Sequence, residues 1–188
     1  MPPIAYTTNI VPNVLQKGDK IRIKGILDDN AQEFSINFVN EICKNPDFIT
    51  YHFKWLLDER VIVENYKDNG SWVDHQEQDY DSLDGVLYSD DNVDVDDDGD
   101  NDNDSQLRYE NNNNNNNNNN TILNYSVLGS IFELEFAFQD DVIDVYKIFD
   151  NKPNRITTYE PYFELSEIKA IQVWGDVKKI SELTFKYA

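Results

Sequence analysis

A chain of 188 residues with a single cysteine, Cys43, is long enough for one domain with a buried core, and it must hold that core without an internal disulfide. Its formal net charge of −20 disfavours nucleic-acid binding, because phosphate groups need a basic surface. No apolar run approaches the roughly 18 residues of a membrane span, and the first residues lack the features of a signal peptide. We therefore expect a cytoplasmic protein that does not insert into membranes.

Short runs of alternating apolar and polar residues, which predict β-strands with one buried face, fill the first part of the chain. Two of these runs cover residues 20–27 and 33–39, and "LQKGD" before the first is typical of a turn. The positions expected to face the core are Ile21, Ile23, Phe34, Ile36 and Phe38. No segment has a convincing helical period, so the pattern indicates an all-β protein.

The stretch from His52 to Trp72 predicts two strands, and its turn "KDNG" then leads into a third strand. On the first of these strands, alternation points one set of side chains toward the core and the other toward solvent. The expected core set is Tyr51, Phe53 and Trp55. If the three strands are neighbours, one exposed face of the sheet collects His52, Asn65 and Trp72, with His75 and Glu77 near the end of the third strand.

Residues 79–121 carry most of the negative charge and end in a run of asparagines, Asn111 to Asn120. They have no hydrophobic periodicity, so they cannot bury enough apolar area to offset the entropy of ordering. We expect them to form a disordered acidic and polyasparagine insertion. Because strand patterns resume beyond it, the insertion is predicted to interrupt a single domain that spans residues 1–188.

Within the insertion, "DVDDDG" from Asp94 to Gly99 matches the start of a calcium loop of the type D-x-D-x-D-G. The match then fails, because Ser105 occupies the position of the bidentate glutamate and no flanking helices are indicated. A zinc site made of His52, His75 and Glu77 is the other metal hypothesis. We favour neither the calcium site nor the zinc site, and we predict that the protein binds no metal and needs no cofactor.

After the insertion, residues 131–138 alternate again, with Phe132, Leu134, Phe136 and Phe138 expected in the core. Further strands are predicted within residues 141–149, 155–160, 168–177 and 180–187. Many short antiparallel strands with one apolar face and one polar face indicate an antiparallel two-sheet β-sandwich. No catalytic motif accompanies them, so we expect a protein that is not an enzyme.

The chain resembles the galectins, the galactoside-binding lectin family, whose shared pattern places H-x-N-x-R, V-x-N and W-x-x-E-x-R on neighbouring strands. The segments "VLQKGDKIRIKG", "PDFITYHF" and "IKAIQVWGDVKKISELTF" are similar to strands of that family, so the resemblance covers almost the whole chain apart from the insertion. It implies a jelly-roll-like, concanavalin-type lectin sandwich. It also implies binding of β-galactosides on glycans or glycoproteins.

The resemblance implies a role for three residues that match the family pattern. His52 would contact the axial hydroxyl of galactose, Asn65 would lie near its hydroxymethyl group, and Trp72 would stack on its apolar face. Each residue also has a purely structural alternative. Trp72 could cap a hairpin or cover the base of the insertion, His52 could be an ordinary sheet residue, and Asn65 could hydrogen-bond a turn.

Four positions depart from the family pattern. Asn, Arg, Glu and Arg of the family are replaced by Lys54, Leu56, His75 and Glu77. Losing the arginine and its orienting glutamate removes charge-assisted hydrogen bonds of roughly 1.5–3 kcal/mol each. We therefore predict weakened or altered galactoside specificity, in which Lys54, His75 and Glu77 either contact the sugar or remain solvated surface side chains.

A function of another class remains open: an interaction module that has lost sugar binding and attracts basic partners through its acidic insertion. The family resemblance further implies synthesis in the cytoplasm with possible export that needs no signal peptide. Since the chain holds one domain, multivalent binding would require self-association, with a homodimer as the simplest form.

Overall fold

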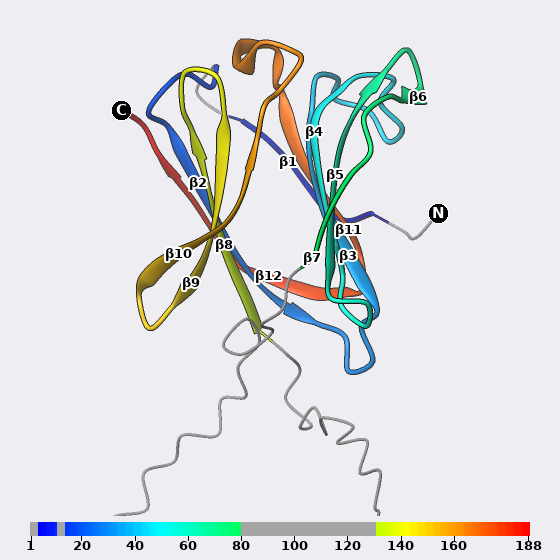
Figure 1. Ribbon diagram of the computed structural model, residues 1–188, viewed down its shortest axis with the longest axis vertical. Helices are drawn as coiled ribbons and strands as arrows, with labels where there is room; N and C mark the ends of the chain where they lie inside the picture. The colour runs from blue at the N-terminus through cyan, green and yellow to red at the C-terminus, as the bar shows by residue number, and fades with distance from the viewer. Residues whose placement is uncertain (1–3, 11–13, 80–130) are drawn as a thin grey trace, which may run out of the picture. The chain divides into compact units, whose positions relative to one another are not determined.

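The computed structural model describes residues 4–10, 14–79 and 131–188. These residues form two antiparallel β-sheets that pack face to face (Figure 1), which confirms the predicted all-β sandwich. Apart from Asp79, the insertion predicted at 79–121 lies outside the described residues, as does the calcium-loop motif. In the part of the chain that the structure describes, no helix is long and apolar enough to cross a membrane.

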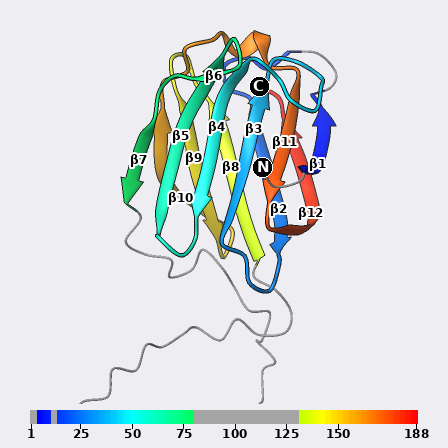
Figure 2. The ribbon, with the colours of Figure 1, turned by 90° about the vertical axis from the view of Figure 1, so that its right-hand side faces the viewer.

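The larger sheet has seven strands in the order β1-β11-β3-β4-β5-β6, and β7 also pairs with β5 (Figure 2). Its strands are β1 (Ile4–Asn9), β3 (Glu33–Val39), β4 (Ile49–Leu56), β5 (Val61–Asp68), β6 (Ser71–Trp72), β7 (Gln76–Asp79) and β11 (Ala170–Gly175). β4, β5 and β6 are neighbours, which is the condition under which His52, Asn65 and Trp72 were expected to share one face of the sheet. β1 was not predicted, because the first strand expected from the pattern begins at residue 20.

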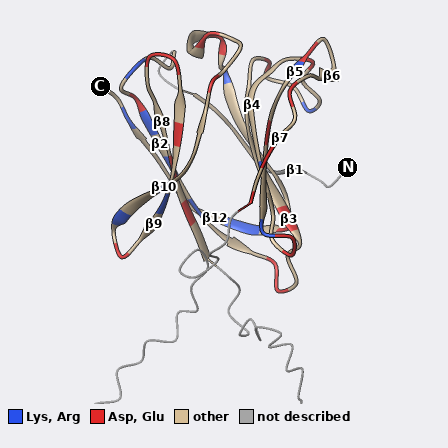
Figure 3. Ribbon diagram, viewed as in Figure 1, with Lys and Arg blue, Asp and Glu red and all other residues tan. Residues whose placement is uncertain are grey.

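The smaller sheet has five strands in the order β10-β9-β8-β2-β12. Its strands are β2 (Lys20–Leu27), β8 (Ile131–Phe138), β9 (Ile143–Phe149), β10 (Lys152–Tyr159) and β12 (Val177–Lys186). A short 3-10 helix, η1 (Leu165–Glu167), is the one helical element of the described residues. Basic and acidic residues are both spread along the ribbon in Figure 3, so the described part is not uniformly acidic.

The core between the sheets includes all of the inward-facing residues that alternation predicted. Phe34 and Phe38 of β3 are at most 1% exposed and pack against the other sheet. Phe34 stacks on Phe132 at a ring distance of 4.6 Å, and Phe38 meets Phe136 in a T-shaped contact at 4.9 Å. Trp55 of β4 is fully buried. Because these side chains fix the inner face of β3 and β4, the intervening side chains of both strands must face outward.

A charged residue of the larger sheet, Glu64, lies on the inner face. The carboxylate of Glu64 on β5 is fully buried and accepts hydrogen bonds from the hydroxyl of Tyr51 (2.5 Å), the hydroxyl of Thr157 (2.6 Å) and the amide of Gln78 (2.9 Å). Since Thr157 belongs to β10, this cluster ties one edge of the larger sheet to the smaller sheet. Burial raises the pKa of Glu64, and the hydrogen bonds from Thr157 and Tyr51 oppose that rise.

The predicted "KDNG" turn joins β5 to β6. Asn69 and Gly70 both have positive φ angles, 48° and 79°, which is the backbone of a two-residue hairpin turn. The Gly70 N–H also donates to the Asp47 carbonyl at 2.9 Å, which holds the turn against the loop before β4. The turn sets the register in which Trp72 lies opposite Lys67.

Candidate functional site

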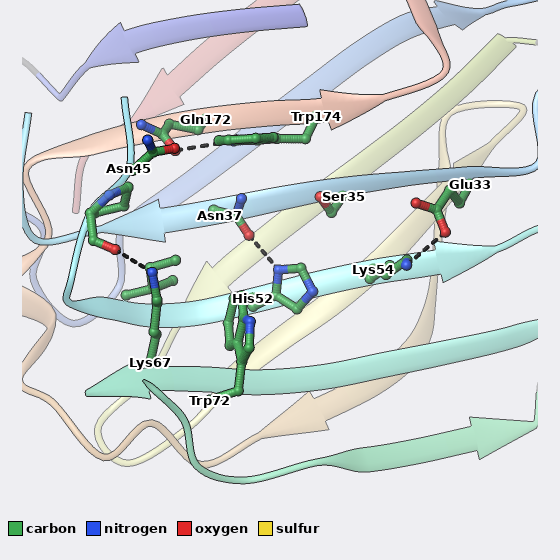
Figure 4. Close-up of a pocket in the computed structure, with 12 residues that line it drawn as sticks. Glu33, Ser35, Asn37, Asn45, His52, Lys54, Lys67, Trp72, Gln172 and Trp174 are labelled. Atoms are coloured by element: carbon green, nitrogen blue, oxygen red, sulfur yellow. Dashed lines mark hydrogen bonds and ion pairs between the residues drawn. The ribbon is translucent and has the colours of Figure 1, made fainter. Parts of the chain in front are cut away.

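A groove of about 220 Å³ lies on the outer face of the larger sheet and crosses β11, β3, β4 and the β5–β6 hairpin (Figure 4). Two indoles, two lysines and several polar side chains surround it. The lining residues are Glu33, Ser35, Asn37, Asn45, Pro46, Ile49, His52, Lys54, Lys67, Trp72, Gln172 and Trp174. Three of the six site residues predicted from the sequence, His52, Lys54 and Trp72, are among them.

Trp72 forms the wall of the groove on the β6 side. Its side chain is 47% exposed, so much of the indole is accessible to a ligand. The ring lies 4.6 Å from the His52 ring, at an interplanar angle of 47° (Figure 4). This position excludes a purely core role for Trp72.

His52 projects from β4 beside the indole, and its Nδ1 lies 2.5 Å from the Oδ1 atom of Asn37 on β3. An amide oxygen can only accept a hydrogen bond, so Nδ1 must carry the proton and Nε2 is left as an acceptor. Burial lowers the pKa of His52 to about 3, and the charges of Lys54 and His75 act in the same direction. The imidazole is therefore neutral at physiological pH.

Asn65 lies directly opposite His52 in the β4–β5 pair, but it does not line the groove. It is only 5% exposed, and its Oδ1 accepts hydrogen bonds from the backbone N–H groups of Tyr66 and Asp74, both at 2.8 Å. The bond from Asp74 fastens the chain between β6 and β7 to β5. For a ligand, the Asn65 side chain can offer only its amide N–H groups.

Lys54 forms an ion pair with Glu33, with 2.6 Å between Nζ and Oε2. The two side chains, 30% and 35% exposed, come from adjacent strands and place a cation and a carboxylate together in the groove. Glu33 is not among the site residues predicted from the sequence. Once the β3–β4 register is known, alternation identifies it, because Ser35 pairs with Lys54 and Glu33 is two residues away on the same face.

His75 and Glu77 lie outside the groove. They pair with each other at 2.6 Å between Nε2 and Oε1, and their side chains are 61% and 60% exposed. No group of three His, Cys, Asp or Glu residues within the described ranges is arranged to hold a metal ion, so His52, His75 and Glu77 do not form the zinc site considered from the sequence.

The far end of the groove is formed by β11, a strand whose contribution the sequence analysis missed. Trp174 is 8% exposed, and its Nε1 donates to the Oε1 atom of Gln172 at 3.1 Å (Figure 4). Gln172 in turn donates from Nε2 to the Cys43 carbonyl at 2.6 Å. The second indole and its glutamine are thus fixed in place and extend the groove beyond the predicted residues.

The family model of the galactoside-binding lectins matches residues 5–185. The chain belongs to this family. Its fold is also that of solved galectins: sheep galectin-11 (TM-score 0.61, 17% identity, 99% of both chains covered) and a variant of human galectin-16 (0.60, 19%, 97% of this chain and 95% of that one). The galectin LEC-6 of Caenorhabditis elegans is similar as well (0.60, 14%, 100% and 95%). No curated protein sequence matches the chain.

The chain is therefore a galectin-like lectin. The family resemblance placed Leu56 at the position of an arginine in the galectin site, and this side chain does not line the groove. Of the two groove lysines, Lys54 lies on the same strand as Leu56, and its carboxylate partner Glu33 comes from the neighbouring strand β3. The ion pair of this groove is therefore built from different strands than the family pattern implies.

Proposed function

We propose that this galectin-like lectin binds glycans in the groove on the outer face of the larger sheet, with a weakened or altered preference for β-galactosides. The observation that carries the proposal is the half-exposed indole of Trp72 beside the neutral imidazole of His52. An accessible aromatic wall with fixed hydrogen-bonding groups next to it suits a sugar ring, which has an apolar face and a polar rim.

Each lining group has a defined chemical capacity toward such a ring. The apolar face of a pyranose would stack on Trp72. The free Nε2 of His52 would accept a hydrogen bond from a sugar hydroxyl, and the Lys54–Glu33 pair would offer a donor and an acceptor to neighbouring hydroxyls. The amide N–H groups of Asn65 would be available at the edge.

The expected weakening follows from what replaces the family arginine. A guanidinium presents several donors in a rigid fork, whereas the single ammonium of Lys54 is a point charge already engaged by Glu33. Each lost charge-assisted hydrogen bond costs roughly 1.5–3 kcal/mol, which is about tenfold or more in affinity. The Lys54–Glu33 pair offsets part of this loss.

Titration with lactose, followed by tryptophan fluorescence, tests the proposal. We expect a saturable response in the millimolar range. Trp72→Ala lacks the reporting indole, so its binding is measured by isothermal titration calorimetry, which should show none. Tyr162→Ala is the matched control, because Tyr162 is an exposed aromatic residue that does not line the groove. Unchanged glycan binding in Trp72→Ala would refute the site, and micromolar lactose affinity would refute the weakening. A glycan array would identify the preferred sugar.

A further inference from the structure

Lys67 lies at the Trp72 end of the groove. It pairs with Trp72 across the β5–β6 hairpin, and its Nζ lies 5.9 Å from the centroid of the indole (Figure 4). The ammonium donates to the Pro46 carbonyl at 2.8 Å, so two of its three N–H groups are not used by that bond. No carboxylate within the described ranges forms an ion pair with Lys67.

The other charges of the groove cancel. Lys54 and Glu33 form an ion pair, and His52 is neutral because burial suppresses its protonation. Lys67 is therefore the uncompensated charge among the groove residues. The formal net charge of the whole chain is −20, so the protein as a whole would repel an anion. Any attraction of an anion to the groove must therefore come from the local charge of Lys67.

We propose that the groove prefers a glycan with an anionic substituent, a sulfate ester or a carboxylate, and that Lys67 binds this substituent. The inference rests on the proposed function, since it assumes that a sugar ring stacks on Trp72. A ring in that position places its substituents near the ammonium beside the indole. Hydrogen bonds from an ammonium to such an anion are charge-assisted, which makes them stronger than bonds to a neutral hydroxyl.

A purely structural role for Lys67 predicts different behaviour. The lysine could hold the loop before β4 through Pro46 and support the indole by a cation–π contact. In that case its removal would weaken the binding of neutral and anionic glycans by the same factor. A role in anion recognition affects the ratio of the two affinities, and this ratio is the quantity to measure.

The experiment compares lactose with its monosulfated and sialylated derivatives at about 0.15 M salt, where distant charges are largely screened. For the unchanged protein we expect at least one anionic derivative to bind about three- to tenfold more tightly than lactose. Lys67→Gln should abolish this preference, so that the anionic derivatives and lactose bind this variant with about equal affinity. Lys179→Gln, the same charge change at an exposed position on β12, should retain the preference.

Each outcome separates the hypotheses. Preference for the sulfated or for the sialylated sugars alone supports the proposal and identifies the anion. Equal affinity for lactose and all its anionic derivatives overturns this inference but leaves the proposed function intact, as does an equal loss for all ligands in Lys67→Gln. If neither lactose nor any derivative binds, the proposed galactoside-type site and this inference are both wrong.

Discussion

The 2.5 Å hydrogen bond between His52 Nδ1 and Asn37 Oδ1 sets the chemistry that the imidazole can offer to a ligand. It joins side chains that lie opposite each other on β4 and β3. Because the amide oxygen accepts, the proton lies on Nδ1, and Nε2 is left as the acceptor. His52 is thereby a hydrogen-bond acceptor of defined orientation. The sugar-binding role proposed for it depends on a residue, Asn37, that the sequence analysis did not select.

We expect Asn37→Ala to weaken glycan binding by about tenfold, because the imidazole loses the partner that fixes its tautomer. Asn37→Asp is the sharper variant. A carboxylate beside the ring would stabilise the imidazolium and raise the pKa of His52, which NMR titration of the ring would detect. An unchanged glycan affinity in Asn37→Ala, with the protein folded, would contradict the role of this hydrogen bond.

The lowered pKa of His52 predicts acid sensitivity of the fold. The ordinary value is 6.5, and burial lowers the pKa in the folded protein to about 3. Between these values the unfolded chain binds a proton that the folded protein does not, so this group's contribution to stability is full above pH 6.5 and is lost as the pH falls toward 3. Urea unfolding at several pH values measures the slope.

The second histidine provides the control for this measurement. His52→Gln should flatten the dependence of the unfolding free energy on pH between about 6.5 and 3. His75→Gln should not, because His75 and its ion-pair partner Glu77 are both well exposed. The same slope in both variants would show that His52 does not control the acid response.

The Lys54–Glu33 pair predicts a loss of binding without a matching loss of stability. Because both side chains are about one-third exposed, breaking the pair should cost about 0–1 kcal/mol of unfolding free energy. We expect Glu33→Gln and Lys54→Met each to lower glycan affinity about three- to tenfold. Isothermal titration calorimetry provides the affinities and thermal unfolding provides the stabilities.

An exposed ion pair elsewhere serves as the control for Glu33→Gln. Lys178 and Asp29 are 3.9 Å apart and well exposed, and neither lines the groove. Asp29→Asn therefore changes the charge by the same amount and should leave binding intact. Equal effects of Glu33→Gln and Asp29→Asn on affinity would mean that net charge, and not the pair, is responsible.

The parts of this structure that the sequence predicted are those that local alternation controls. The period of two decides which side of a strand is buried, so Phe34, Phe38 and Trp55 were correctly expected in the core. The same rule placed His52 on the outer face. The short turn after Lys67 made β5 and β6 neighbours, which brought Trp72 to the same groove.

The missed residues depend on pairing between distant segments. Trp174 and Gln172 reach the groove only because β11 pairs with β3, more than 130 residues earlier in the chain. The local sequence pattern of residues 170–175 does not indicate which strand lies beside β11. For Asn65, alternation predicted the face of the sheet but not the partners of the side chain. Its Oδ1 is occupied by backbone N–H groups, one of which belongs to Asp74 and depends on the path of the chain after Trp72.

Glu64 predicts how the two sheets respond to the loss of a buried carboxylate. Glu64→Ala would leave the hydroxyls of Tyr51 and Thr157 without their acceptor and would create a cavity, at a cost of about 3–5 kcal/mol of unfolding free energy. Glu64→Gln keeps the shape and an acceptor oxygen, so it should be less damaging. Denaturant unfolding of both variants at neutral pH checks this order.

The sign of the pH dependence at Glu64 is opposite to that at His52. Because burial raises the pKa of Glu64 above the ordinary 4.5, its stabilising contribution is full below that value and is lost as the pH rises through the folded pKa. The stability of Glu64→Gln relative to the unchanged protein should therefore increase with pH above about 4.5. Glu182→Gln, at an exposed position on β12, should show no such trend, and a parallel trend in the two variants would exclude Glu64 as its source.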